Sequence, residues 1–175
     1  AIIYSDKLTT VSPNHRNELL SIEGSMGLDC VLRFREFDFS GILNGIDYEE
    51  FNPSRDKNIP FNYDESNFLE AKQKNKEELF EEFNIKDEGK PLFSMVSRVT
   101  WQKGMDLVFA ASEELLQRGA NIAILGSGEP RYEQMMQSLR DRYPNNVLVY
   151  IGYNDALAHK IYASSDFFFM PSLFE

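Results

Sequence analysis

The segment PLFSMVSRVTWQKG, residues 91–104, decides the fold of this chain. Residues 92–96 form an apolar run of strand length, and a polar turn that ends in glycine follows at once. Apolar residues then recur at helical spacing as far as Gly119. The segment therefore predicts a strand that leads through a turn into a helix.

The turn carries two cations, Arg98 and Lys103, five residues apart. A turn from strand to helix directs backbone N–H groups and the positive end of a helix dipole at an anion. Arg98 adds a planar bidentate donor and Lys103 a point charge, which together suit a polyphosphate. On spacing alone, two ordinary solvated loop cations explain the pattern equally well.

The same alternation continues outward from this segment. Further strands are expected at residues 122–125, 147–151 and 167–170, with helical patterns between them. Strict alternation of strands and helices predicts an α/β fold with a parallel, doubly wound sheet. The Met and aromatic residues at helical spacing are predicted to be core, not cofactor contacts. Ligands of such sheets bind at the carboxyl ends of the strands, where the loops lead into the helices.

Those loops carry the remaining candidate residues. The pair Gly126 and Gly128 lets backbone approach a ligand closely, although simple tight turning is an equal alternative and the third glycine of a dinucleotide fingerprint is missing. Tyr153 follows a strand end, where its ring could pack against a base or merely against the surface. Glu175 is expected at the same edge of the sheet. The alternative is that its position there has no functional meaning. His159 is predicted to be a structural histidine.

The first part of the chain is less regular. Residues 7–11 read as a short strand, and Ser12 with Pro13 suits the start of a helix. A short helix is expected within residues 28–35. A strand at residues 40–43 is expected to end at the Asn44-Gly45 turn.

A connecting segment follows at residues 47–64, which lack apolar periodicity. Beyond it, Leu79, Phe80 and Phe83 fall on one face of an otherwise charged helix. Asn84 is a suitable residue to end that helix.

Charge and composition narrow the function classes. With a formal net charge of -10 and a pI of about 4.7, the chain as a whole repels nucleic acid and anionic membranes. Arg98 and Lys103 would then form a local positive island.

The single cysteine, Cys30, excludes an internal disulfide and is predicted to be a small buried residue. Only two histidines make a structural zinc site unexpected, and no metal site is predicted.

Four motifs in order carry a resemblance to a known family: SGILNGIDY at residues 40–48, VSRVTWQKG at 96–104, IGYN at 151–154 and DFFFMPSLFE at 166–175. Together with KLTTVSP and FNP in the first part of the chain, they resemble bacterial glycogen synthase and plant starch synthase. The resemblance covers essentially the whole chain and is weakest at residues 56–88.

The resemblance implies a GT-B fold, in which two Rossmann-like domains face each other across a cleft. It implies transfer of glucose from ADP-glucose to the non-reducing end of an α-1,4-glucan, with retention and with neither metal nor cofactor. Residues 1–46 would be the end of the amino-terminal, acceptor-side domain with the crossing segment. Residues 47–90 would be a linker with a charged helix, and residues 91–175 the first half of the nucleotide-sugar-binding domain.

Further expectations concern partners and location. ADP-glucose and the α-glucan are the implied partners, with no nucleic acid and no membrane. The location would be cytoplasmic in a bacterium and plastid in a plant. The isolated chain is expected to be inactive, because the opposite wall of the cleft is missing, and to self-associate through its unfinished sheet.

The resemblance also assigns roles to residues. Arg98 and Lys103 would hold the donor pyrophosphate, Tyr153 would pack near the adenine, Glu175 would contact the sugar and Asn44 would line the sugar pocket. The predicted catalytic residues are Arg98, Lys103 and Glu175, and the predicted substrate-binding residues are Asn44, Arg98, Lys103, Gly126, Gly128 and Tyr153.

Three alternatives stay open from the sequence. The first is another retaining GT-B transferase that uses a UDP- or GDP-sugar. The second is a non-catalytic nucleotide- or glucan-binding module, since a fold alone does not establish activity. The third is a flavodoxin-like regulator, which would need an acidic pocket where this chain has cations and glycines.

Overall fold

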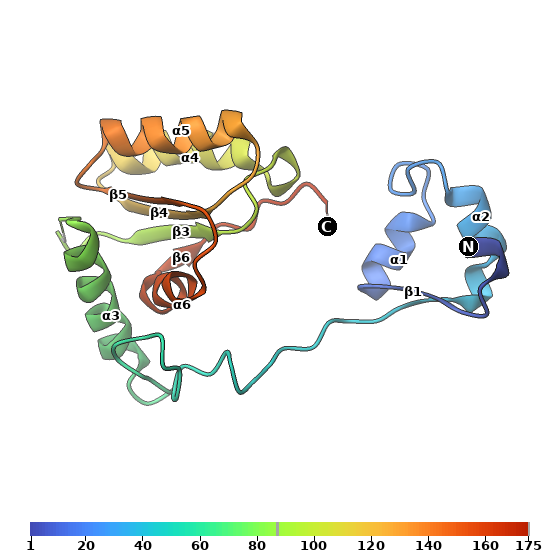
Figure 1. Ribbon diagram of the computed structural model, residues 1–175, viewed down its shortest axis with the longest axis horizontal. Coiled ribbons are helices and arrows are strands. Elements are labelled where there is room, and N and C mark those ends of the chain that lie inside the picture. The colour runs from blue at the N-terminus through green and yellow to red at the C-terminus, as the bar shows by residue number, and fades with distance from the viewer. Residues whose placement is uncertain (87, 175) are drawn as a thin grey trace. The chain divides into compact units, whose positions relative to one another are not determined.

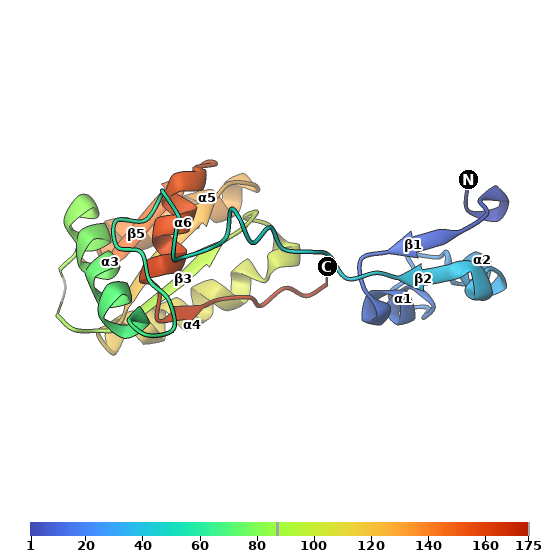
Figure 2. The same ribbon diagram turned by 90° about the horizontal axis from the view of Figure 1, so that it is seen from below.

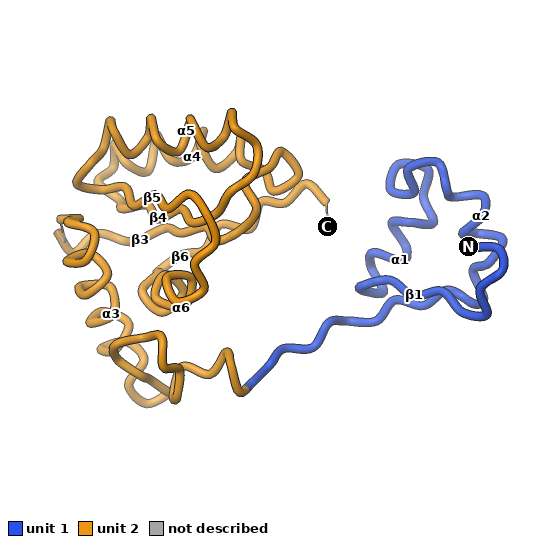
Figure 3. Tube along the Cα trace, in the orientation of Figure 1, with its two compact units in different colours: residues 1–48 blue, residues 49–175 orange. Residues whose placement is uncertain are grey.

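The structure is a computed structural model that describes residues 1–86 and 88–174. The chain forms two compact units, Ala1–Tyr48 and Glu49–Glu175, which Figure 3 distinguishes by colour. Each unit is described by itself. In the described part of the chain, none of the helices combines the length and the apolar character that crossing a membrane requires.

Unit 1 is small and only partly regular. Its elements are the 3-10 helix η1 (Ile2–Tyr4), β1 (Leu8–Thr10), α1 (Pro13–Leu19), α2 (Asp29–Phe34), the 3-10 helix η2 (Glu36–Asp38) and β2 (Phe39–Gly41). The two strands pair in parallel, with Leu8 opposite Phe39. Helix α1 begins as predicted: the Ser12 side chain accepts a hydrogen bond of 2.9 Å from the His15 backbone N–H, and Pro13 is the first helical residue.

Two expectations for unit 1 need correction. The strand expected at residues 40–43 is β2, which starts one residue earlier and ends at Gly41. The prediction that Cys30 is buried is wrong, because its side chain is exposed. Helix α2 has only six residues, and Leu32 is its one buried residue. So short a helix covers little surface, which leaves Cys30 in solvent.

Unit 2 contains the alternating pattern. Its elements are α3 (Phe68–Phe83), β3 (Leu92–Val96), the 3-10 helix η3 (Trp101–Lys103), α4 (Met105–Gln117), β4 (Asn121–Gly126), α5 (Pro130–Arg142), β5 (Val147–Ile151), α6 (Asp155–Ser164) and β6 (Phe167–Phe168). The four strands form one parallel sheet in the order β5-β4-β3-β6. Strand β6 is shorter than the expected residues 167–170, because only Phe167 and Phe168 pair with β3.

Helices cover both faces of this sheet, as a doubly wound fold requires. In Figure 1, α4 and α5 lie over one face and α3 and α6 over the other. Strand β4 is buried along its whole length. Its Ile122 and Ile124 join the core cluster with residues of α4 and α5, whereas Ala123 and Leu125 join the cluster with residues of α3 and α6. The predicted α/β architecture is confirmed.

Helix α3 packs beside α6, as Figures 1 and 2 both show. Its Leu79 and Phe80 are only 1% and 2% exposed. Asn84 adopts the left-handed conformation, with φ of 55°, and ends the helix as predicted. Lys72 donates hydrogen bonds of 3.1 and 3.0 Å to the Tyr162 and Ala163 carbonyls near the end of α6. These bonds satisfy carbonyls that a helix end leaves without partners.

Candidate functional site

The candidate site lies at the carboxyl ends of the parallel strands, where β3, β4 and β5 lead into α4, α5 and α6. A hollow of about 270 Å³ opens there. Residues from three loops line it, among them Ser97, Arg98, Gly126, Ser127, Tyr153 and Asn154. The fold thus brings three of the predicted site residues, Arg98, Gly126 and Tyr153, to one hollow.

Arg98 is exposed at this hollow. Its guanidinium donates a hydrogen bond of 3.2 Å to the Gln102 side chain, four residues further along the same loop. Among the residues that the structure describes, no acidic group lies within ion-pair distance of Arg98. The positive charge is therefore held by a neutral partner and is not cancelled by a carboxylate, which suits an anion-binding role.

The loop between β3 and α4 is fixed by contacts that the sequence did not reveal. The Glu129 side chain accepts a hydrogen bond of 2.9 Å from the Trp101 backbone N–H. Gln102 donates from its side chain to the Phe174 carbonyl at 3.0 Å, and its own carbonyl accepts from the Leu173 N–H at 2.9 Å. Lys103 ends η3 in this loop and is half-buried. Glu129 and Gln102 thus set the course of the loop that carries the two cations.

Both glycines of the predicted pair allow two loops to run against each other. Gly126 has φ of 157°, and a Cβ there would lie 1.9 Å from the Ser97 carbonyl oxygen. A Cβ at Gly128 would lie 2.3 Å from the Val99 carbonyl oxygen. The Gly128 N–H already donates to the Glu133 side chain at 2.8 Å. The close approach that these glycines allow in this structure is therefore to the neighbouring loop.

Tyr153 and Asn154 form the third side of the hollow. The Tyr153 side chain is 86% exposed, and its hydroxyl donates to Asp155 at 3.4 Å. An exposed ring at the rim of a hollow offers a flat face to a planar ligand. Asn154 caps α6, because its side chain accepts a hydrogen bond of 3.0 Å from the Leu157 N–H. This cap was not predicted, although an Asn before a helical period signals one.

The helix starts add to the electrostatics of this edge. Helices α4, α5 and α6 all begin at the loops that follow the strands. The first turn of each helix carries N–H groups without helical partners and a partial positive charge. Of these three helices, α6 begins among the residues that line the hollow, because Asn154 caps it, so a negatively charged ligand there would face the start of α6 as well as Arg98.

Lys103 and Gly128 lie in the neighbouring loops but do not line the hollow, and two further predicted site residues are not placed at it. Asn44 is exposed in unit 1, beyond β2, and is described with that unit alone. Glu175 lies outside the described residues. The roles expected for both residues stay predictions.

Comparison with known proteins agrees with this geometry. Residues 75–175, more than half of the chain, match the family model described as glycosyl transferases group 1. The chain belongs to this family. Within it, the predicted resemblance to glycogen and starch synthases is confirmed by relatives that match along the whole chain.

Two of these relatives are glycogen synthases. The chain is 46% identical over 175 residues to that of Clostridium beijerinckii, and 44% identical over 174 residues to that of Kosmotoga olearia. Each match covers 99% of this chain and 36% of the relative. The chain therefore spans about a third of the length of the curated relatives that it matches.

A solved structure gives the same result. The catalytic domain of starch synthase IV from Arabidopsis thaliana, bound to ADP and acarbose, matches with a TM-score of 0.93 and 33% identity. The match covers 99% of this chain and 36% of that chain. The Rossmann-like sheet of this group 1 chain thus corresponds to part of a GT-B catalytic domain.

Proposed function

We propose that this chain carries part of the donor site of an ADP-glucose-dependent glycogen or starch synthase. The whole protein would transfer glucose to the non-reducing end of an α-1,4-glucan with retention. The observation that carries the proposal is the exposed guanidinium of Arg98, which no described carboxylate pairs, at the rim of a hollow that also has an exposed aromatic ring. Relatives named glycogen synthase and a starch synthase that binds ADP support it.

The chemistry gives the cations a role in catalysis. During transfer the bond between glucose C1 and the β-phosphate oxygen breaks, and ADP leaves with the electron pair. Negative charge grows on the phosphate and positive charge on the sugar ring. Arg98 and Lys103, aided by the start of α6, would stabilise the leaving phosphate more in the transition state than in the ground state. The acceptor hydroxyl bonds to C1 and gives up its proton, for which the leaving phosphate is the proposed base.

The remaining assignments follow from this proposal. Tyr153 would pack against the adenine, Asn44 and Glu175 would contact the donor sugar, and Gly126 and Gly128 would shape the wall of the hollow.

Residues 1–46 would belong to the acceptor side, 47–90 to the linker and its helix, and 91–175 to the donor side. We expect no turnover from this chain alone, because a transferase must orient two substrates and these residues are about a third of the relatives' length.

Titration of the chain with ADP by calorimetry tests the donor site. We expect Arg98→Ala and Lys103→Ala each to weaken ADP binding about tenfold to a hundredfold, because each removes a charge-assisted contact. Arg118→Ala is the control, because this exposed arginine follows the end of α4 and pairs with Glu114. Equal ADP affinity in all three variants would remove the proposed role of the two cations.

Turnover in the protein that carries this segment separates the alternatives. ADP-glucose, UDP-glucose and GDP-glucose are compared as donors with a glucan acceptor. Preference for ADP-glucose is the expected result, and preference for another donor would sink the ADP assignment. Nucleotide binding with no transfer from any donor would favour a non-catalytic module.

A further inference from the structure

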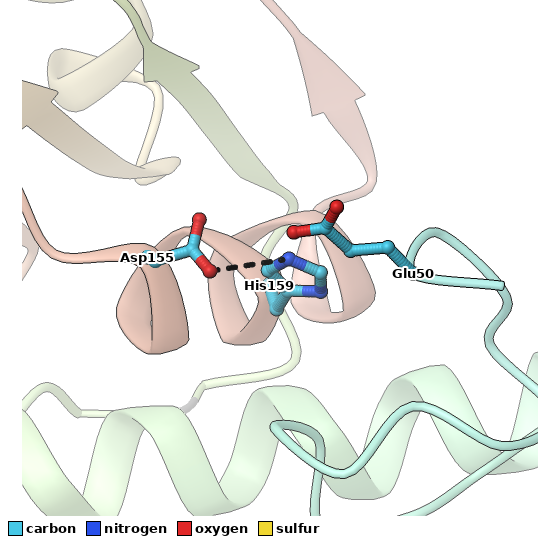
Figure 4. Close-up of side chains that lie close together, drawn as sticks. All are labelled: Glu50, Asp155 and His159. Carbon is cyan, nitrogen blue, oxygen red and sulfur yellow. Dashed lines mark ion pairs between the residues drawn. The ribbon is translucent and has the colours of Figure 1, made fainter. Parts of the chain in front are cut away.

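A second cluster of polar side chains lies outside the donor hollow. Glu50, in the connecting segment, meets Asp155 and His159, which stand four residues apart in α6 (Figure 4). One ligand atom from each residue lies within 4.8 Å of the other two. Within the described part of the chain, no other group of three or more carboxylate, imidazole or thiol side chains lies so close together.

His159 is the unusual member of this cluster. Its side chain is only 3% exposed, yet its Nε2 atom is buried without a hydrogen-bond partner. Figure 4 shows its ring between the two carboxylates, and Nε2 lies 3.9 Å from Asp155 Oδ2. Buried polar atoms in native proteins nearly always have a partner, so an unsatisfied nitrogen beside two acids needs a physical reason.

The opposite side of the ring shows which nitrogen carries the proton. His159 Nδ1 lies 2.5 Å from Asp56 Oδ2, whose side chain is 9% exposed. An ionised carboxylate only accepts hydrogen bonds, so Nδ1 donates and neutral His159 keeps a lone pair on Nε2. Phe51 stacks on the ring, with centroids 5.0 Å apart and planes inclined by 12°. Asp56 and Phe51 thus fix the direction of that lone pair.

This arrangement is the one that metal-binding histidines use, in which a carboxylate on one ring nitrogen orients the other toward the ion. We propose that Glu50, Asp155 and His159 bind a Zn²⁺ ion, with Asp56 as the residue that orients His159. One imidazole and two carboxylates match the mixed nitrogen and oxygen ligands of zinc, whereas Mg²⁺ and Ca²⁺ prefer oxygen alone. The sequence has few Cys and His residues, so a zinc site was not predicted from it. The count missed this site because two of the three proposed ligands are acidic residues.

The ion would tie the connecting segment to the first two turns of α6. Asp155 directly follows Tyr153 and Asn154, which line the donor hollow. Bound zinc would therefore fix the start of α6 next to the nucleotide without touching it. The site does not depend on the proposed function, and it has no part in the transfer itself.

Titration with Zn²⁺ alone tests the site, in a Cys30→Ser background because the exposed thiol binds zinc by itself. We expect one ion per chain and at least a tenfold loss of affinity in both Glu50→Gln and Asp155→Asn. Both side chains are exposed, so neither change threatens the fold. Glu78→Gln and Asp141→Asn remove the same charges elsewhere on exposed positions of unit 2 and should leave affinity unchanged.

Co²⁺ in place of Zn²⁺ gives a spectroscopic readout. Visible absorption of a nitrogen- and oxygen-ligated Co²⁺ is expected, with loss of the bands in His159→Gln. Zinc affinity that is equal in the two ligand variants and the two controls would overturn the proposal, as would no binding at all. In that case His159 is a structural residue held by Asp56 and Phe51. ADP binding measured in the same samples is expected to persist either way, so failure of the zinc site is distinct from failure of the donor site.

Discussion

The two units of this chain use similar elements but are held together differently. Unit 2 has a four-stranded sheet between two core clusters, and β4 is buried along its whole length. In unit 1 only Ser25, Leu32 and Phe39 are buried. There, Arg35 donates to the carbonyls of Ile2, Ile3 and Ser5 at 2.9, 2.8 and 2.6 Å. Apolar packing stabilises unit 2, whereas polar contacts connect the segments of unit 1.

The contrast shows that apolar packing is concentrated in unit 2. A unit as short as Ala1–Tyr48 buries a smaller share of its surface than a larger one, so its stability is expected to be low. Unit 1 also exposes large apolar side chains such as Phe34 and Phe37, at 79% and 101%. The expected self-association of the chain stays a prediction, and light scattering that finds a monomer would count against it. Paired substitutions, one in each unit, test the contrast directly.

The largest loss of stability is expected from substitutions of buried leucines. Leu139 on α5 is 1% exposed in the cluster with α4, and Leu32 on α2 is 6% exposed in unit 1. Leu139→Ala should lower the free energy of unfolding of unit 2 by about 3–5 kcal/mol, because it leaves a cavity in a packed core. Urea unfolding of the four-stranded sheet, followed by circular dichroism, measures this loss.

Leu32→Ala is the matched change in unit 1. It should leave the unfolding midpoint of unit 2 unchanged and raise amide hydrogen exchange only within residues 1–48. A shift of the unit 2 midpoint in Leu32→Ala would show that the two units unfold together, and the contrast would fail.

A smaller loss of stability is expected at Gly126, and none is expected at Gly45. Gly126→Ala forces a Cβ to within 1.9 Å of the Ser97 carbonyl oxygen at a φ of 157°. Backbone strain and the forced shift of the loop should together cost about 2–4 kcal/mol. In unit 1, a Cβ at Gly45 meets nothing within 4 Å. Gly45→Ala should therefore leave thermal stability unchanged, and equal melting temperatures for the two variants would contradict the close approach of the loops.

Sequence patterns predicted unit 2 well because its elements repeat a strong physical signal. Buried parallel strands produce continuous apolar runs, and the helices on both faces keep their own period. Even so, apolar spacing does not identify every buried residue of α4: Leu107 is 56% exposed, whereas Met105 and Phe109 are in the core. Unit 1 lacks such a signal, which is why Cys30 was placed in a core that α2 does not form.

The hollow at the strand ends and the His159 cluster also differ in how well the sequence predicted them. Arg98, Gly126 and Tyr153 each lie close to a strand end, so the topology alone predicted that they meet. Asp56 and His159 come from segments 103 residues apart, and neither belongs to a repeating pattern. The Glu129 contact to the Trp101 N–H likewise depends on how two loops approach each other. Contacts of this kind follow from tertiary structure and leave no local signal.

The smallest effects are expected from two ion pairs of equal length. Lys76 and Asp166 in unit 2, and Lys7 and Asp38 in unit 1, each lie 2.8 Å apart. The Lys76 side chain is 6% exposed and the Lys7 side chain 73%. Lys76→Met should destabilise unit 2 by about 1–2 kcal/mol, less than a fully buried pair, because Asp166 is partly exposed and still accepts from the Leu92 N–H.

Lys7→Met should leave the unfolding of unit 2 unchanged and instead act on the titration of Asp38. The hydrogen bond from Lys7 lowers the pKa of Asp38 most, its charge lowers the pKa further, and Arg35 adds to both effects. A carboxyl group with a lowered pKa stabilises the folded state above its unfolded pKa, and this contribution is lost as the pH falls through the folded pKa. In Lys7→Met, NMR titration should find the Asp38 pKa raised toward its ordinary value but still below it, because Arg35 remains 3.3 Å away. An unchanged pKa would mean that solvent already screens the Lys7 contact, and that Arg35 alone holds this carboxylate.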